Sequence, residues 1–153
     1  MNVDLQDPRA LIDAAYACIS GPAGAPRDWA TLRTLYLPRA LLLRTVYDDA
    51  GEPQAKVFNV DEYIADTTPF FARESFHEVA TGFAIQRFGA VASVRSTYEA
   101  KRDPRDTEVI KRGVNFLSLF HDGNRWWIAS IVWDNEAEGR VLPREWSEAK
   151  GER

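Results

Sequence analysis

His77 is the first residue to consider for chemistry, because it is one of only 2 histidines in the chain. Imidazole titrates near neutral pH without help from its surroundings, which suits a general acid or base. Strand alternation around His77 places it on one face with Val79, Phe83 and Ile85. A histidine on such an apolar face either lines a pocket and transfers protons or is hydrogen-bonded structural material. Both interpretations remain open.

Glu78 and Glu99 form a second, weaker catalytic candidate. A two-residue turn at Phe88-Gly89 would place the two carboxylates opposite each other on neighbouring strands. Carboxylates in contact raise the pKa of one of them, and such a pair can act as general acid and base. We favour the alternative, an ion network in which nearby cations neutralise both carboxylates. The candidate cations are Arg95, Lys101 and Arg112.

A polar cross-strand pair, Asn115 and Ser130, is expected on an otherwise apolar strand face. The register follows from a two-residue turn at Asp122-Gly123, and the apolar residues of that face are Leu117, Leu119, Trp126, Ile128 and Val132. Buried polar groups need partners. The two side chains either satisfy each other or orient a ligand in an apolar cavity.

The motifs of several enzyme classes are missing from the sequence. His77 and His121 are 44 positions apart and neither has a neighbouring His or Cys, so we expect no metal site. There is no nucleophile with an adjacent base, no phosphate-binding glycine loop and no dinucleotide fingerprint. We therefore expect no cofactor, and hydrolase, kinase and redox activities lack their required residues.

Composition limits the partners and the compartment. With 45% hydrophobic and 27% charged residues, the chain has enough apolar mass to bury a core. The formal net charge of -4 and the absence of a long block of one sign argue against nucleic acid as a partner. The single cysteine, Cys18, fits a reducing compartment. Without a signal peptide or about 18 consecutive apolar residues, we expect one cytoplasmic domain over residues 1–153 and no membrane partner.

Helices are expected in the first half of the chain. Asp7 before Pro8 predicts a helix from Pro8 to about Ser20, and Asp28 caps a second helix that Pro38 stops. A third helix begins near Asn59 to Asp61 and presents Tyr63, Ile64 and Thr67 on one face. Pro69 should end or kink that helix before Phe70 and Phe71.

Strands dominate the second half. A hairpin over Leu41 to Tyr47 and Ala55 to Phe58 comes first, and short connections then predict an antiparallel meander of four strands. The four runs are Phe76 to Arg87, Val91 to Lys101, Val109 to His121 and Arg125 to Asn135. Helices followed by a long antiparallel sheet predict an α+β architecture with the helices on one face. Residues 137–153 are a polar tail, docked or frayed.

The side of the sheet away from the helices is also expected to be apolar. In the register set by Asp122-Gly123, this second face carries Phe116, Trp127, Ile131 and Trp133. A solvated sheet face should alternate apolar with polar residues, so something must cover it. A second copy of the chain is the economical cover, and we predict a homodimer through these residues.

Several segments occur in a characteristic order: Arg27-Asp28-Trp29 with Leu35-Tyr36-Leu37-Pro38, Asp61-Glu62-Tyr63-Ile64, Phe76-His77-Glu78, Arg87-Phe88-Gly89 with Ser96-Thr97-Tyr98-Glu99, Arg112-Gly113-Val114-Asn115, and Asp122-Gly123 with Arg125-Trp126-Trp127-Ile128. Over roughly residues 7–136, the order resembles the NTF2-like superfamily, and more narrowly its SnoaL-like group of uncharacterised bacterial proteins. The resemblance implies a cone-shaped, cystatin-like α+β fold: three N-terminal helices packed on a strongly curved, mainly antiparallel sheet, with a pocket at the wide end and frequent dimerisation. It also implies that Trp29, Tyr36, Tyr63 and Phe71, otherwise core residues, line the mouth of the cone.

Such a fold does not select one activity. We favour a homodimer that binds a small, largely apolar organic molecule in this pocket without chemistry. The alternative is a lyase or isomerase, like a dehydratase, a ketosteroid isomerase or a polyketide cyclase, using acid-base chemistry there. In the ketosteroid isomerase branch a helix tyrosine works with two interior carboxylic acids, and we find no matching pair of aspartates. A third hypothesis, an interaction module, would have the cone filled by side chains.

Overall fold

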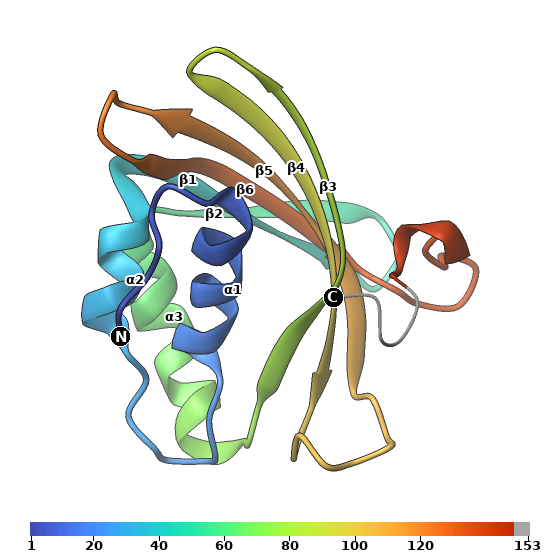
Figure 1. Cartoon of the computed structure of the whole chain (residues 1–153). Helices are drawn as coiled ribbons and strands as arrows, with labels where there is room; N and C mark the ends of the chain where they lie inside the picture. Colours follow the sequence, from blue (N-terminus) through green and yellow to red (C-terminus); the bar gives the residue numbers. More distant parts are fainter. Residues whose placement is uncertain (149–153) are drawn as a thin grey trace.

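Three helices pack on one side of a single six-stranded sheet in the computed structural model, which describes residues 1–148. The helices are α1 (Pro8–Ile19), α2 (Trp29–Leu35) and α3 (Val60–Arg73). The strands are β1 (Tyr36–Tyr47), β2 (Pro53–Phe58), β3 (His77–Phe88), β4 (Val91–Lys101), β5 (Lys111–His121) and β6 (Trp126–Asn135). Figure 1 shows the sheet bent around the helices, which gives the molecule a cone-like shape. This confirms the expected α+β architecture.

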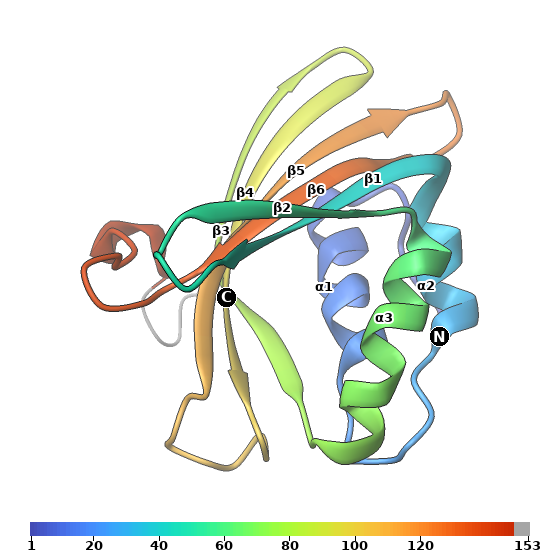
Figure 2. The ribbon, with the colours of Figure 1, turned by 180° about the vertical axis from the view of Figure 1, so that it is seen from behind.

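The sheet order is β2-β1-β6-β5-β4-β3. Strands β3 to β6 form the expected antiparallel meander, and β1 joins it through a parallel pairing with β6. Seen from behind in Figure 2, β1 and β2 lie over α3, and α1 stands beside it under the curve of the sheet. The most deeply buried core residues lie between these layers and include Leu11, Leu32, Leu42, Trp126 and Ile128.

All three predicted helix starts are confirmed by their caps. The Asp7 side chain accepts a hydrogen bond from the backbone N–H of Arg9, and Asp28 accepts one from Thr31. Asn59 and Glu62 form a reciprocal capping box at the start of α3. These bonds satisfy backbone donors that a helix N-terminus otherwise leaves unpaired.

The expectation that Pro69 either ends or kinks the helix is wrong in its first form, because α3 continues through the proline to Arg73. Proline removes one backbone donor from the helix. The last turn is held by aromatic packing instead: the ring of Phe71 lies 5.5 Å from those of Phe70 and Phe76. Burial of this cluster offsets the missing hydrogen bond.

The register between β3 and β4 differs from the prediction. The turn is Gly89-Ala90, with Gly89 at φ 55°, and Thr81 forms a bulge where the pairing shifts between Ala80 and Gly82. As a result, Glu78 pairs with Ala100, while Glu99 pairs with Val79. Adjacent residues of a strand point to opposite faces, so the predicted contact between Glu78 and Glu99 is wrong.

The register between β5 and β6 is also shifted. The connection spans Asp122 to Arg125, because the Asp122 side chain accepts hydrogen bonds from the backbone of Asn124 and Arg125. A bulge at Ala129 then moves the pairing by one more residue. Asn115 therefore pairs with Trp133 and not with Ser130, and the predicted polar pair is wrong.

These shifts divide the predicted dimer face between the two sides of the sheet. Ile131 and Trp133 point toward the helices, where they line a cavity. Phe116 stays on the outer side with 48% of its surface exposed, and Trp127 pairs with the outward-facing Phe120. The prediction that all four residues form one face is therefore wrong, because the bulge reverses the alternation after Ile128.

Part of the tail is docked on the outer side of the sheet. A short 3-10 helix, η1 (Arg144–Trp146), brings the Trp146 ring to 6.1 Å from that of Phe116. The Glu148 backbone N–H donates to Thr81, and the Glu148 carboxylate binds Arg9 at 2.9 Å. Residues 149–153 of the predicted tail lie outside the described part of the chain.

Candidate functional site

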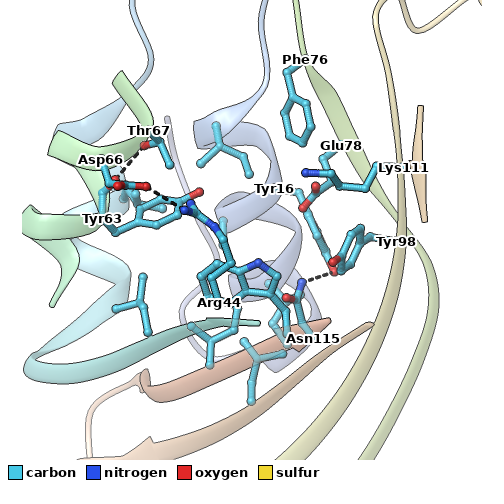
Figure 3. Close-up of a pocket in the computed structure, with 18 of the residues that line it drawn as sticks. Tyr16, Arg44, Tyr63, Asp66, Thr67, Phe76, Glu78, Tyr98, Lys111 and Asn115 are labelled. Atoms are coloured by element: carbon cyan, nitrogen blue, oxygen red, sulfur yellow. Dashed lines mark hydrogen bonds and ion pairs between the residues drawn. The ribbon is translucent and has the colours of Figure 1, made fainter. Parts of the chain in front are cut away.

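A cavity of about 260 Å³ lies between the concave face of the sheet and the helices. Figure 3 shows the side chains around it, which come from both layers of the fold. Apolar and aromatic groups form most of the wall. The polar and charged side chains that line it are Tyr16, Tyr36, Arg44, Tyr63, Asp66, Thr67, Glu78, Tyr98, Lys111, Asn115 and Asn135.

Four tyrosines contribute rings and hydroxyl groups to the wall. Tyr16 comes from α1, Tyr36 from the start of β1, Tyr63 from α3 and Tyr98 from β4. Burial raises the pKa of all four hydroxyls, so they are neutral at physiological pH. Among residues 1–148, the hydroxyls of Tyr36 and Tyr63 have no hydrogen-bond partner, although both residues are largely buried. They are available to a bound molecule.

The other two tyrosines belong to a buried hydrogen-bond network. The Asn115 side-chain amide donates to the Tyr16 hydroxyl at 3.0 Å, and that hydroxyl shares a 2.7 Å hydrogen bond with the Ser96 hydroxyl. The Tyr98 hydroxyl donates to Asn135 at 2.6 Å. Asn115 is thus anchored by helix α1 and not by a neighbouring strand, and the network fixes one polar wall of the cavity.

Glu78 is the buried carboxyl group of the cavity, with 9% of its surface exposed. Across the residues that the structure describes, no hydrogen bond and no ion pair within 4.0 Å reaches its side chain. Burial raises the pKa of Glu78 to about 8, and the Lys111 ammonium opposes this only in part. The carboxyl group is consequently protonated at neutral pH and can donate a hydrogen bond into the cavity.

An ion cluster forms another part of the wall. Asp66 on α3 accepts hydrogen bonds from Arg44 at 2.7 Å and from Lys56 at 2.8 Å. These two cations hold the pKa of Asp66 below its usual value. The Arg44 guanidinium also lies over the rings of Phe58 and Trp133, at 5.2 and 5.8 Å from their centroids. Figure 3 shows this guanidinium directed toward Asp66.

Lys111, the first residue of β5, is the other cation besides Arg44 that lines the cavity among the described residues. Its ammonium lies 5.7 Å from the centroid of the Phe76 ring. Although the residue as a whole is exposed, desolvation lowers the pKa of Lys111, and the nearby Glu78 carboxyl opposes that shift. The ammonium has no ion-pair partner within residues 1–148.

The structure gathers some of the predicted site residues and separates others. Tyr36, Tyr63, Phe71 and Asn115 all line the cavity. Trp29 does not line the cavity; its ring packs 6.0 Å from that of Phe71. The sequence singled out none of Arg44, Asp66 and Lys111, although Arg44 is a lone cation in the apolar run 41–47.

Three predicted residues lie elsewhere. His77 does not line the cavity but an adjoining hollow beside α1, together with Arg9, Asp13 and Lys101; Tyr16 and Glu78 lie between the two and line both. Ser130 pairs with the exposed Ser118 on the outer side of the sheet.

Glu99, the third, lies 3.9 Å from Lys101 and 3.8 Å from Arg112. The ion network that we expected around both carboxylates therefore forms around Glu99 and does not include Glu78.

Residues 1–148 contain neither a group of potential metal ligands nor a helix that could span a membrane. No three His, Cys, Asp or Glu side chains in this range are grouped as metal ligands would be. No helix in this range combines the length and apolar character that crossing a membrane requires.

Comparison with known proteins identifies the fold. The sequence matches no protein-family model and no curated protein. An NTF2-like protein of unknown function from Pseudomonas putida aligns over 88% of this chain and 89% of its own, with a TM-score of 0.64 and 12% identity. An NTF2-like protein of unknown function from Silicibacter pomeroyi covers 84% and 92%, with a TM-score of 0.52 and 17% identity. The yeast UBP3-associated protein BRE5 covers 84% and 93%, with a TM-score of 0.59 and 11% identity.

The chain therefore has the NTF2-like fold, an α+β cone of three helices against a curved sheet. At these identities the likeness concerns the fold alone, so the function has to be argued from the site.

Proposed function

We propose that this protein binds a small organic molecule in the cavity between the sheet and the helices. The observation that carries the proposal is the cavity itself: about 260 Å³ of space, mostly aromatic walls and a few polar groups that converge on it. Binding sites for small molecules are commonly built in this way. An interaction module with the cone filled by side chains would not leave such a space.

Tyr36, Tyr63, Phe71 and Asn115 are the ligand contacts in this proposal. The Tyr36 and Tyr63 hydroxyls are free to pair with a polar atom, and Phe71 offers an apolar surface. Asn115 holds Tyr16 in place through its amide. We further propose that residues 1–153 form a single domain, with its core at about 7–136, that belongs to the SnoaL-like group. In this proposal the protein is cytoplasmic and needs neither a cofactor nor nucleic acid.

Binding can be tested with three aromatic probes of similar size: benzyl alcohol, benzylamine and benzoate. Ala15 lines the cavity from α1, and Ala15→Phe should fill part of that space. Ala17 lies on the same helix but lines only the adjoining hollow beside His77, so Ala17→Phe makes a matched control. At least one probe should bind the unmodified protein and Ala17→Phe, observed by NMR titration, and lose affinity for Ala15→Phe. No binding by any probe, or equal binding to both variants, would contradict the proposal.

An acid-base lyase or isomerase in the same cavity is the second candidate function. Glu78 favours it, because a carboxyl group with a pKa of about 8 can accept or donate a proton near neutral pH. His77 and Glu99 lie outside the cavity and take no part in this version. Once a substrate is found, Glu78→Gln should lower kcat by roughly 100-fold to 10,000-fold, the usual scale for a proton-transfer group. Unchanged turnover would remove the candidate.

Homodimerisation through the outer side of the sheet completes the proposal. Of the four residues predicted for the dimer contact, Phe116 and Trp127 lie on this side, next to the exposed apolar side chains of Phe120 and Val132. Exposed apolar groups on adjacent strands favour burial against a second copy. Ile131 and Trp133 are no longer included, because they belong to the cavity.

A further inference from the structure

We propose that the ligand of the cavity is a compact organic anion, a carboxylate attached to an aromatic or aliphatic body, held by Arg44 and Lys111. This inference rests on the ligand-binding function proposed above and assigns its ligand class. It comes from the charges that line the cavity, from the donors that the protein leaves unused, and from the aromatic walls.

The charges of the wall do not cancel. Asp66 is shared by two cations, Arg44 and Lys56, so this cluster carries one uncompensated positive charge. Lys111 adds another, and it has no ion-pair partner in the described part of the chain. Glu78 is the remaining acid, and it is protonated at neutral pH. An anion entering the cavity therefore meets an excess of positive charge beside apolar walls, where such attraction is stronger than in open water.

Arg44 has the geometry to hold a carboxylate. One of its N–H groups donates to Asp66, and the rings of Phe58 and Trp133 support the guanidinium plane. Its other N–H donors have no acceptor among residues 1–148. A guanidinium offers several donors in a rigid planar arrangement that matches the two oxygens of a carboxylate.

Lys111 places a second donor on the cavity wall. The Arg44 guanidinium is close enough to contribute to lowering the pKa of Lys111, so a carboxylate between the two cations would relieve that repulsion. The Glu78 hydroxyl can donate a further hydrogen bond to the same anion. The aromatic side chains around these groups, including Tyr63 and Phe71, provide an apolar surface for the rest of the molecule.

An organic amine is the competing ligand, because aromatic rings and one carboxyl group can also hold an ammonium group. Its binding would require ionised Glu78, and it would place a third positive charge beside Arg44 and Lys111. The arrangement of charges therefore favours the carboxylate, and the experiment decides between the two.

The three probes share a phenyl ring and differ in its substituent, which is a hydroxymethyl group, an aminomethyl group or a carboxylate. At pH 6.5, benzoate should bind with a Kd at least about tenfold lower than benzyl alcohol, the gain expected from one charge-assisted hydrogen bond. Benzylamine should bind most weakly. If benzylamine or benzyl alcohol binds as tightly as benzoate, the carboxylate assignment is overturned, while binding of a small molecule in the cavity stands. If no probe binds, both proposals fail.

Two variants locate the anion. Arg44→Met and Lys111→Met should each weaken benzoate by about tenfold or more and change benzyl alcohol by less than about threefold, since only the charged contacts are lost. Arg44→Met leaves Asp66 paired with Lys56, and Lys111→Met breaks no ion pair in the described residues, so both should fold. Arg33→Met and Lys101→Met are the controls, because neither residue lines the cavity. Equal losses for both probes, or unchanged benzoate binding, would refute the assigned site.

Discussion

Replacing Glu78 by glutamine should remove one component of the pH dependence of folding stability. The ordinary pKa of this group is 4.5, and burial raises it to about 8 in the folded protein. As the pH rises above 4.5, the unfolded chain therefore releases the proton before the folded chain does. The folded state then binds more protons than the unfolded state. The contribution of Glu78 to the free energy of unfolding is therefore fully present below pH 4.5 and is lost as the pH rises toward 8. Glutamine keeps the shape of the neutral acid and does not titrate.

The size of the effect follows from the width of that window. Each pH unit within it lowers the free energy of unfolding by about 1.4 kcal/mol, so Glu78 removes about 3 kcal/mol between pH 4.5 and pH 7. Glu78→Gln should thus match the unmodified protein at pH 4.5 and exceed it by about 3 kcal/mol at pH 7. Urea unfolding of both proteins at several pH values gives the difference. The contributions of all other titrating groups cancel in this difference between the two free energies of unfolding, because both proteins contain those groups.

A matched substitution outside the cavity provides the control. Glu99→Gln removes a carboxylate from the ion network with Lys101 and Arg112 and should change stability by less than about 1 kcal/mol, as for other partly exposed ion pairs. If the curves for Glu78→Gln and the unmodified protein run parallel, or if the variant is less stable at pH 7, Glu78 is ionised in the folded state. The neutral carboxyl group that both functional proposals use would then be wrong.

Three further predictions concern other parts of the molecule. His77→Gln should leave the benzoate affinity unchanged in the same titration, because His77 lies outside the cavity; a large loss would place the ligand in the hollow beside α1. Tyr16→Phe removes a hydroxyl that pairs with Ser96 and Asn115, and should lower the free energy of unfolding in urea by about 1 to 3 kcal/mol; an unchanged value would mean that the network contributes nothing net. Phe120→Glu should convert a dimer into a monomer in sedimentation velocity, because it puts a charge into the proposed contact; a monomeric unmodified protein at micromolar concentration would contradict the dimer.

Local signals in the sequence predict the elements well. The caps Asp7, Asp28 and Asn59 mark the helix starts because their side chains bond to donors only two or three residues away. Pro69 misled the same reasoning, since the packing that carries α3 through it involves Phe76, which lies beyond the helix. Local patterns contain no information about such tertiary contacts.

Register was the part that the sequence could not settle. A single extra residue reverses the alternation of every side chain beyond it, and Ala129 gives no sign that it is the residue added to β6. A glycine inside a strand often marks a bulge, yet Gly113 pairs with both neighbouring strands without a register shift and is small for a different reason. A Cβ there would lie 2.3 Å from the Tyr98 hydroxyl and 2.5 Å from the Asp134 carbonyl oxygen.

The two bulges also determine the chemistry of the cavity. Strict alternation from Phe83 and Ile85 would turn His77 toward the helices and Glu78 away from them. The bulge at Thr81 reverses this, so the cavity receives a carboxyl group in place of an imidazole. The bulge at Ala129 acts in the same way on β6 and brings Trp133 to the inner side, where its ring supports Arg44. Two one-residue insertions in the sheet therefore keep His77, the residue that looked most reactive in the sequence, out of the cavity, and they bring in the Glu78 carboxyl group and the Trp133 ring that supports Arg44.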